Sequence, residues 1–322
     1  MTRDVKLFAL ELETHDAEPM LQLLTARGDS PLELTERQLL ERQIILQAER
    51  IRTVVAPNTP RGVLPVVVGP EFFFTGLGNR PYNYGTFSAS LPHLEQVSRS
   101  YPDVLWCPGT VWWKEKLVDK RGPESRVHNT ALVFQGGRLI GSHQKTRVSD
   151  LDPQHPTHPL QWDEDETIFA RIAQETQFPF FDAEMPGGGE AVRIGLEVGM
   201  DHVRSWDSAE GRPSPFGDLR SRYLEASTRR AGGRGVDLHL LTTAGTPIHE
   251  ADVVARDGGA VFSSDGGVDA NPRSRSGYVT RSGVDRATSL REWRPSIRYS
   301  TPRFHTEPGR VRVAEHPSIA LG

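Results

Sequence analysis

The chain has 322 residues, of which 36% are hydrophobic and 25% are charged, and its formal net charge is −4. This composition is typical of a globular protein that buries a core, and it excludes disorder along the whole chain. A negative net charge argues against nucleic acid as the main partner, because binding to phosphates needs a concentrated basic surface, so we expect a small-molecule substrate or ligand.

Strands and helices are predicted to alternate from the start of the chain. The sequence predicts a strand over residues 5–12, a long amphipathic helix over 34–55 and a strand buried on both faces over 63–68. Glu71 follows this buried strand closely. We therefore expect a carboxylate just beyond the carboxyl end of a central strand.

The alternation continues through the middle of the chain. A helix is predicted around residues 91–98 and a strand over 104–113. Residues 129–134 and 138–143 flank a pair of glycines, which favours a tight turn and hence an antiparallel hairpin.

The remaining elements fall into a core part and a terminal segment. In chain order they are a polar, proline-containing loop over 149–165, strands over 178–181 and 192–198 around a triple-glycine turn at 187–189, a helix over 219–230, and strands over 236–242 and 260–262. We predict one α/β domain over residues 1–270. From residue 271 the chain is rich in Arg, Ser and Pro, so 271–322 is predicted to be an extended C-terminal tail packed on the domain or on a partner subunit.

Two absences in the sequence narrow the class of protein. No apolar run approaches the roughly 18 to 20 residues needed to span a bilayer, and the first residues lack the apolar core of a signal peptide, so we expect a cytoplasmic protein with no membrane partner. Cys107 is the single cysteine, which excludes an internal disulfide and a multi-cysteine metal site. Because it lies in an apolar strand, we interpret it as a small buried hydrophobe.

Three segments carry a family resemblance: residues 66–74 (VVVGPEFFF), 141–145 (GSHQK) and 194–202 (IGLEVGMDH). In order and spacing they resemble the motifs of the carbon-nitrogen hydrolase (nitrilase) superfamily over roughly residues 5–265. The resemblance implies an α/β fold of four layers, an α-β-β-α sandwich with helices outside two packed sheets. It also implies a homodimer or a higher homo-oligomer.

The resemblance assigns catalytic positions to Glu71 and Lys145. In that family a glutamate acts as general base, a lysine stabilises the oxyanion, and a cysteine attacks the carbon of a nitrile or amide. Glu71 takes the position of the base and Lys145 that of the oxyanion-stabilising group. Taken without the resemblance, the two residues are equally well interpreted as a partly buried ion pair with no role in catalysis.

Gly199 stands where the family carries its cysteine nucleophile. No thiolate can form there, and neither Met200 nor the glycine backbone replaces it. The second glutamate of the family, expected about eight residues after the lysine, is also missing, since Pro153 lies there. Two of the four catalytic positions have therefore changed.

The other residues expected at the site are Phe73, Met200, Asp201 and His202, as lining of a substrate-binding cleft. Histidines and aspartates also occur nearby, but their spacing matches no compact metal motif, so we expect no metal and no other cofactor. These residues are His143, His155, His158, His202, Asp150, Asp152 and Asp201.

Three hypotheses for the function follow. In the first, a nitrilase-like protein has lost thiol-dependent hydrolysis and keeps a site for a small amide, nitrile or carboxylate. That site either binds a ligand or runs an altered reaction in which Glu71 deprotonates water or the substrate and Lys145 holds an anion. In the second, the chain is an ordinary carbon-nitrogen hydrolase inactivated by an introduced change at position 199. In the third, it is a structural subunit that pairs with an active relative.

Overall fold

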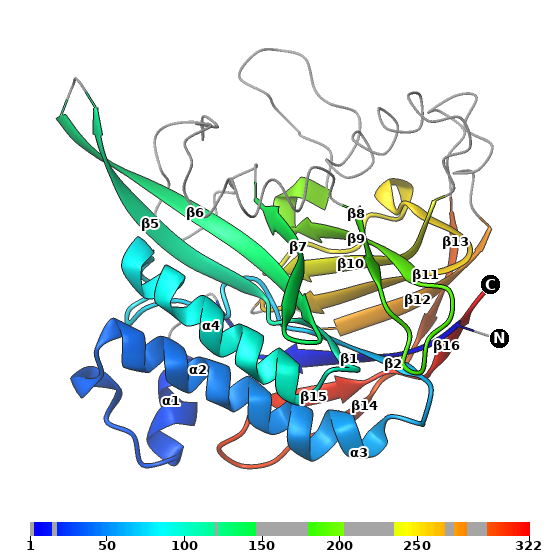
Figure 1. The fold of residues 1–322 in the computed structure, drawn as a ribbon, viewed down its shortest axis with the longest axis horizontal. Coiled ribbons are helices and arrows are strands. Elements are labelled where there is room, and N and C mark those ends of the chain that lie inside the picture. Colours follow the sequence, from blue (N-terminus) through cyan, green and yellow to red (C-terminus); the bar gives the residue numbers. More distant parts are fainter. Residues whose placement is uncertain are drawn as a thin grey trace.

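The computed structural model describes residues 3–14, 18–119, 122–145, 180–202, 235–267, 274–281 and 295–322. In these residues two β-sheets pack face to face, and helices cover the outer face of the larger sheet (Figure 1). The predicted α/β fold with two packed sheets is confirmed. The predicted loop over 149–165 and the predicted helix over 219–230 lie outside the described residues.

The larger sheet has 10 strands in the order β14-β15-β1-β2-β4-β6-β5-β3, with β7 paired to β6 and β16 paired to β1. Its central strands β1, β2 and β4 are parallel, and the pairs β4–β6, β5–β6 and β6–β7 are antiparallel. The strands are β1 (Arg3–Glu11), β2 (Leu64–Val68), β3 (Tyr82–Asn83), β4 (Leu105–Cys107), β5 (Thr110–Asp119), β6 (Gly122–Gln135), β7 (Arg138–Gln144), β14 (Arg303–His305), β15 (Arg312–Glu315) and β16 (Ile319–Leu321).

The smaller sheet has 6 strands in the order β13-β12-β11-β10-β9-β8. Strands β9, β10 and β11 are parallel, and β8 forms an antiparallel hairpin with β9 through the turn that holds the triple glycine, as predicted. The strands are β8 (Phe180–Ala183), β9 (Val192–Val198), β10 (Val236–Thr243), β11 (Ala255–Asp265), β12 (Ser274–Arg281) and β13 (Ser296–Ser300).

Helices pack on one face of the larger sheet. They are α1 (Glu18–Ala26), α2 (Glu36–Arg50), α3 (Ala56–Asn58) and α4 (Tyr84–Ser100), and a π-helical turn over Ile51–Val55 joins α2 to α3. Helix α2 begins where predicted because Thr35 forms a capping box: its hydroxyl oxygen accepts the N–H of Gln38, and the Gln38 side chain accepts the N–H of Thr35. No helix among the described residues is long and apolar enough to cross a bilayer.

Alternation along the strands divides the core into two layers. In β2, Val66 and Val68 pack between the two sheets, while Val67 packs against the helices, so the strand is buried on both faces as predicted. The layer between the sheets also receives Leu196 from β9 and Leu240 from β10. This packing fixes the two sheets relative to each other and so brings their strand ends together.

The strand predicted over residues 104–113 is divided into β4 and β5 at Pro108 and Gly109. Gly109 has φ +94°, a conformation that favours glycine, and a Cβ there would collide with the carbonyl oxygen of Pro70 and lie 3.1 Å from Cβ of Phe73. The interruption therefore lets the link between β4 and β5 approach the backbone just before Glu71.

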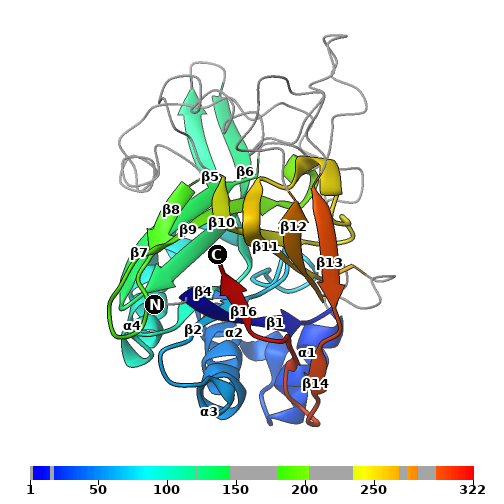
Figure 2. The same cartoon turned by 90° about the vertical axis from the view of Figure 1, so that its right-hand side faces the viewer.

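Residues after 271 contribute strands to both sheets. Strands β12 and β13 extend the smaller sheet beyond β11 (Figure 2). Strands β15 and β16 pair with β1 in the larger sheet. The described part of the segment predicted as an extended tail, packed on the domain or on a partner subunit, forms β-strands, of which β12 pairs with β11 and both β15 and β16 pair with β1.

Candidate functional site

The two sheets meet at the carboxyl ends of their parallel strands. The Thr242 hydroxyl, near the end of β10, donates to the carbonyl oxygen of Gly69, just after β2, at 2.9 Å. The N–H of Glu71 donates to the carbonyl oxygen of Thr243 at 3.1 Å. These bonds tie the segment that carries Glu71 to the smaller sheet. Such strand ends are where α/β folds often place their sites.

Glu71 and Lys145 form a buried ion pair. Lys145 Nζ donates to Glu71 Oε1 at 2.7 Å, and the two side chains are only 4% and 1% exposed. Asn129 Nδ2 donates to the same oxygen at 2.8 Å. The structure therefore brings together the two residues expected at the catalytic positions and adds Asn129 to them.

A row of side chains across three strands builds this cluster. Trp112 of β5 lies opposite Asn129 of β6, and the N–H of Lys145, just after β7, donates to the carbonyl oxygen of Asn129 at 2.9 Å. Residues directly opposite each other on neighbouring strands share one face of the sheet. Asn129 begins one strand of the predicted hairpin but was not among the predicted site residues.

Aromatic rings form the apolar wall of the cluster. The ring of Phe72 lies edge-on to that of Trp112, with centroids 5.8 Å apart, and Lys145 Nζ lies 5.5 Å from the Phe72 centroid. Phe72 has φ +59°, which is strained for a residue with a side chain, and its N–H donates to Thr110 Oγ1 at 2.7 Å. The strained backbone directs the ring toward the lysine.

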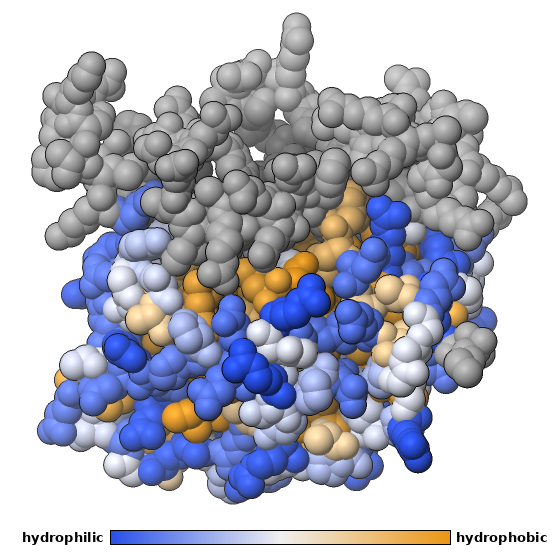
Figure 3. All heavy atoms as spheres, in the orientation of Figure 1, coloured by the Kyte–Doolittle hydropathy of each residue, from blue (hydrophilic) through white to orange (hydrophobic). Residues whose placement is uncertain are grey.

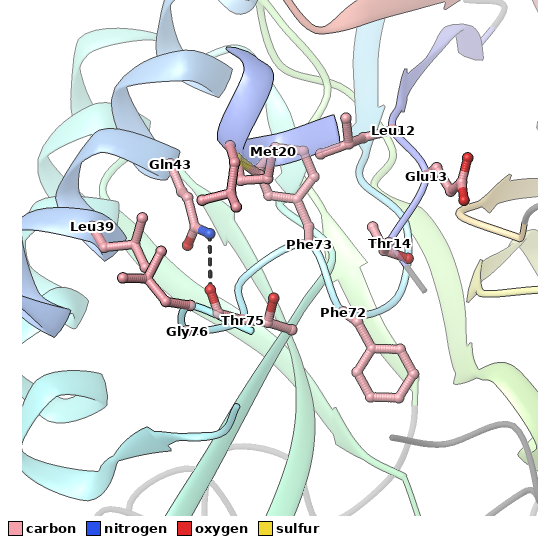
Figure 4. Close-up of a pocket in the computed structure, with 12 residues that line it drawn as sticks. Leu12, Glu13, Thr14, Met20, Leu39, Gln43, Phe72, Phe73, Thr75 and Gly76 are labelled. Atoms are coloured by element: carbon pink, nitrogen blue, oxygen red, sulfur yellow. Dashed lines mark hydrogen bonds between the residues drawn. The ribbon is translucent and has the colours of Figure 1, made fainter. Parts of the chain in front are cut away.

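Phe73, which was predicted to line the site, lies on the other side of this segment. It is buried in the core cluster under the helices, and Figure 4 shows its ring beside Met20 and Leu12 while Phe72 points away from them. The pocket at this place has a volume of about 10 Å³, the room for roughly one water molecule. Phe72, and not the predicted Phe73, therefore lies at the cluster.

Gly199 lies against the Glu71 carboxylate. It opens a 3-10 turn, Gly199–His202, directly after β9, and its φ of +47° falls in the left-handed region that favours glycine. A Cβ at this position would overlap Glu71 Oε2 and lie 3.0 Å from Glu71 Cδ. The carboxylate thus occupies the space that a side chain at position 199 would need.

The other residues of this turn are engaged with the protein. Asp201 is fully buried and its Oδ2 lies 2.8 Å from Nε2 of His143, two residues before Lys145. His202 is also fully buried, and its Nδ1 lies 2.7 Å from Oε2 of Glu197. Met200 is partly buried. Asp201 and His202 were predicted to line a cleft, and in the structure these contacts hold the turn in place.

Among the described residues, one group of histidines and acids is close enough to hold a metal ion: Glu197, His202 and His239. Nε2 of His239 lies 3.0 Å from Glu197 Oε2. The far nitrogens of both histidines accept backbone N–H groups, from His249 at 3.0 Å and from Val254 at 3.2 Å. The ring protons of the neutral histidines must therefore point at Glu197, whereas a metal would need lone pairs there. The group is built as a hydrogen-bond network.

The pKa values of Glu197 and His239 are both lowered within this network. Burial by itself would raise the pKa of Glu197, but the hydrogen bonds from His202 and His239 outweigh it and lower the pKa to about 2. Burial lowers the pKa of His239, against the opposing effect of Glu197. Glu197 is therefore a carboxylate that accepts a hydrogen bond from each of the two imidazoles.

Cys107 is fully buried between the two sheets, as predicted. Burial raises the pKa of its thiol to about 12, so the thiolate is disfavoured. His155, His158, Asp150 and Asp152 lie outside the described residues.

No protein-family model and no curated protein sequence matches the chain. Three solved structures are similar in fold. An N-terminal amidase with a Gln-Gly peptide has 12% sequence identity and a TM-score of 0.35, and the match covers 76% of this chain and 48% of that chain. For a glutamine-dependent NAD+ synthetase from Acinetobacter baumannii the identity is 12% and the TM-score 0.33, with 75% of this chain and 32% of that chain covered; for a glutamine-dependent NAD+ synthetase from Cytophaga hutchinsonii the identity is 10% and the TM-score 0.36, with 99% of this chain and 43% of that chain covered. The chain spans less than half the length of each of these proteins. Likeness this distant does not assign an activity.

Proposed function

We propose that this chain is a nitrilase-type protein that binds a small amide, nitrile or carboxylate and has no thiol chemistry. One observation carries the proposal: the ion pair of Glu71 and Lys145 packs against Gly199, so residues from all three resembling motifs form a single cluster. In that cluster the Glu71 carboxylate takes the space where the family places its nucleophile.

The chemistry of the cluster suits a small polar head group. Lysine, glutamate and asparagine side chains are buried beside the rings of Phe72 and Trp112. Small-molecule sites commonly combine an apolar lining with a few fixed polar groups, and charges act more strongly where water is excluded. Without a nucleophile at position 199, such a site binds its ligand and forms no covalent intermediate.

A reaction that uses no nucleophilic side chain is the second candidate for the same residues. Two donors, Asn129 Nδ2 and Lys145 Nζ, hold the Glu71 carboxylate. A fixed carboxylate beside an ammonium can take a proton from water while the cation stabilises an anion. Formation of product from butyramide or butyronitrile, followed by NMR, separates this candidate from binding alone.

The alternative of an ordinary hydrolase with cysteine at position 199 needs a different local structure. Glu71 would have to move away from position 199, and the cysteine would have to adopt a φ that disfavours side chains. A structural subunit, the remaining alternative, predicts no ligand at this cluster.

The proposal is tested by ligand-observed NMR with butyramide, butyronitrile and butyrate. We expect at least one of them to bind the native protein and to lose that binding in Glu71→Gln, which removes the charge but keeps the shape. Glu315→Gln is the matched control, because Glu315 pairs with Lys6 at 2.5 Å in the larger sheet, outside the cluster. No binding to the native protein, or equal binding to both variants, contradicts the proposal.

A further inference from the structure

Asn129 has a hydrogen-bond acceptor that no described group uses. The residue is 7% exposed, its Nδ2 donates to Glu71 Oε1, and its Oδ1 is buried without a hydrogen-bond partner. The orientation of the amide is fixed by chemistry, because an ionised carboxylate only accepts hydrogen bonds and Nδ2 must therefore face Glu71. The carbonyl oxygen is left on the other branch of the same side chain.

A buried carbonyl oxygen without a donor is unfavourable, and native proteins rarely keep one without a reason. Here the oxygen belongs to the central member of the row formed by Trp112, Asn129 and Lys145. It lies on the same branched amide as the nitrogen bound to Glu71, so it is within a few ångströms of the proposed ligand site. A donor supplied by the ligand would satisfy it.

We propose that Asn129 determines specificity: its Oδ1 accepts an N–H from the bound molecule, so the site selects a primary amide over a carboxylate, nitrile or ketone of similar size. This inference rests on the proposed function and names which of its ligand classes the site takes. A carboxylate would place oxygen lone pairs against Oδ1, and a nitrile or ketone offers no donor. A site built to bond an N–H rejects an analogue without one.

The test compares butyramide with 2-pentanone, which has the same heavy-atom shape and a methyl group in place of the NH₂. We expect the native protein to bind butyramide about 10-fold or more tightly, the effect of one hydrogen bond to an otherwise unpaired buried group. In Asn129→Leu, which keeps similar volume and removes the acceptor, the preference is expected to fall to about 2-fold or less. Gln135→Leu is the control, since Gln135 is a buried amide whose Nε2 donates to Glu184 O, remote from the cluster.

The outcomes separate the two proposals. Equal binding of butyramide and 2-pentanone to the native protein overturns the inference and leaves the proposed function intact; Oδ1 is then satisfied by water. A preference that persists in Asn129→Leu overturns it as well. If none of the ligands binds the native protein, the proposed function fails first. Should Asn129→Leu not fold, the comparison of the two ligands on the native protein decides.

Discussion

At the scale of single residues, the cluster is distinguished by the contact between Gly199 and Glu71: the Glu71 carboxylate fills the space that a side chain at position 199 would need. The φ of Gly199 is +47°, and any Cβ on it would overlap Glu71 Oε2. Glu71 is in turn held by Lys145 and Asn129. Glycine is therefore matched to this position both by its backbone and by its neighbour, and the two effects can be measured separately.

Gly199→Ala is expected to lower the free energy of unfolding by about 2 to 4 kcal/mol, from left-handed strain of roughly 1 to 2 kcal/mol and displacement of the buried carboxylate. In a Glu71→Ala background the same substitution should cost only the backbone part. Urea unfolding of the four proteins gives the coupling between the two sites. Additive changes in the free energy of unfolding would mean that Glu71 does not contact position 199.

Cys107 is expected to react with iodoacetamide only after unfolding. It is fully buried, and with a pKa of about 12 its thiolate fraction at pH 8 is about 10⁻⁴. Intact mass after timed labelling of native and urea-unfolded protein measures this. Rapid labelling of the native protein with loss of ligand binding would instead make Cys107 part of the site.

At the scale of elements, two side-chain contacts hold the turn after β9, one to β7 of the larger sheet and one to β9 itself. Asp201 binds His143 near the end of β7, and His202 binds Glu197 in β9 itself. His239 of β10 binds the same carboxylate. We interpret these as positioning contacts that hold Gly199 against Glu71, because none of these side chains is exposed enough to meet solvent.

This network predicts loss of stability in acid. The pKa of His239 is lowered in the folded protein, so below about pH 6.5 the unfolded chain takes up a proton that the folded one does not, and stability falls as pH falls. The pKa of Glu197 is lowered to about 2, so its contribution is present above about pH 4.5 and is lost as pH falls toward 2.

His239→Gln should therefore flatten the decline in stability between pH 7 and pH 5, since a glutamine can still donate to Glu197 but does not titrate. Urea midpoints at pH 7, 6 and 5 provide the measurement. An unchanged slope would show that His239 binds its proton equally in both states.

At the scale of the whole molecule, the C-terminal strands connect the two sheets. The N–H of His316, between β15 and β16, donates to the carbonyl oxygen of Leu7 in β1 at 2.9 Å. The His316 ring lies 3.1 Å from the hydroxyl oxygen of Ser274 and 2.9 Å from that of Ser276, both in β12 of the other sheet. The coloured part of the face drawn in Figure 3 is mostly hydrophilic, with hydrophobic residues in a few groups. The homo-oligomer stays a prediction.

His316 is expected to be a second source of acid sensitivity. Burial lowers its pKa to about 4, so its contribution is complete above about pH 6.5 and is lost as pH falls toward 4. This lowering of the pKa corresponds to roughly 3 kcal/mol of stability between neutral and acidic pH. His316→Gln should remove most of that decline, seen as a smaller difference between the unfolding free energies at pH 7 and pH 4.5. An equal difference in both proteins would contradict this.

The periodicity of apolar residues and the residues typical of turns were sufficient to predict much of the fold. The helix after Thr35, the doubly buried β2, and the hairpins β6–β7 and β8–β9 all follow from local patterns of apolar and glycine residues. The strands after residue 271 did not follow. They carry many polar residues and little apolar alternation, and they form by pairing with strands far away in the sequence, β12 with β11 and both β15 and β16 with β1.

The sequence by itself determined that a carboxylate, an ammonium and a glycine occupy three spaced motifs, because residue types and their order are read without coordinates. It could not decide which of two adjacent phenylalanines faces Lys145, since that depends on the positive φ of Phe72. Nor could it show that Glu71 fills the space beside Gly199. Both are tertiary contacts, which only the folded chain fixes. Phe72 and Lys145 follow two strands of the larger sheet. Glu71 and Gly199 lie more than a hundred positions apart and meet where the two sheets pack together.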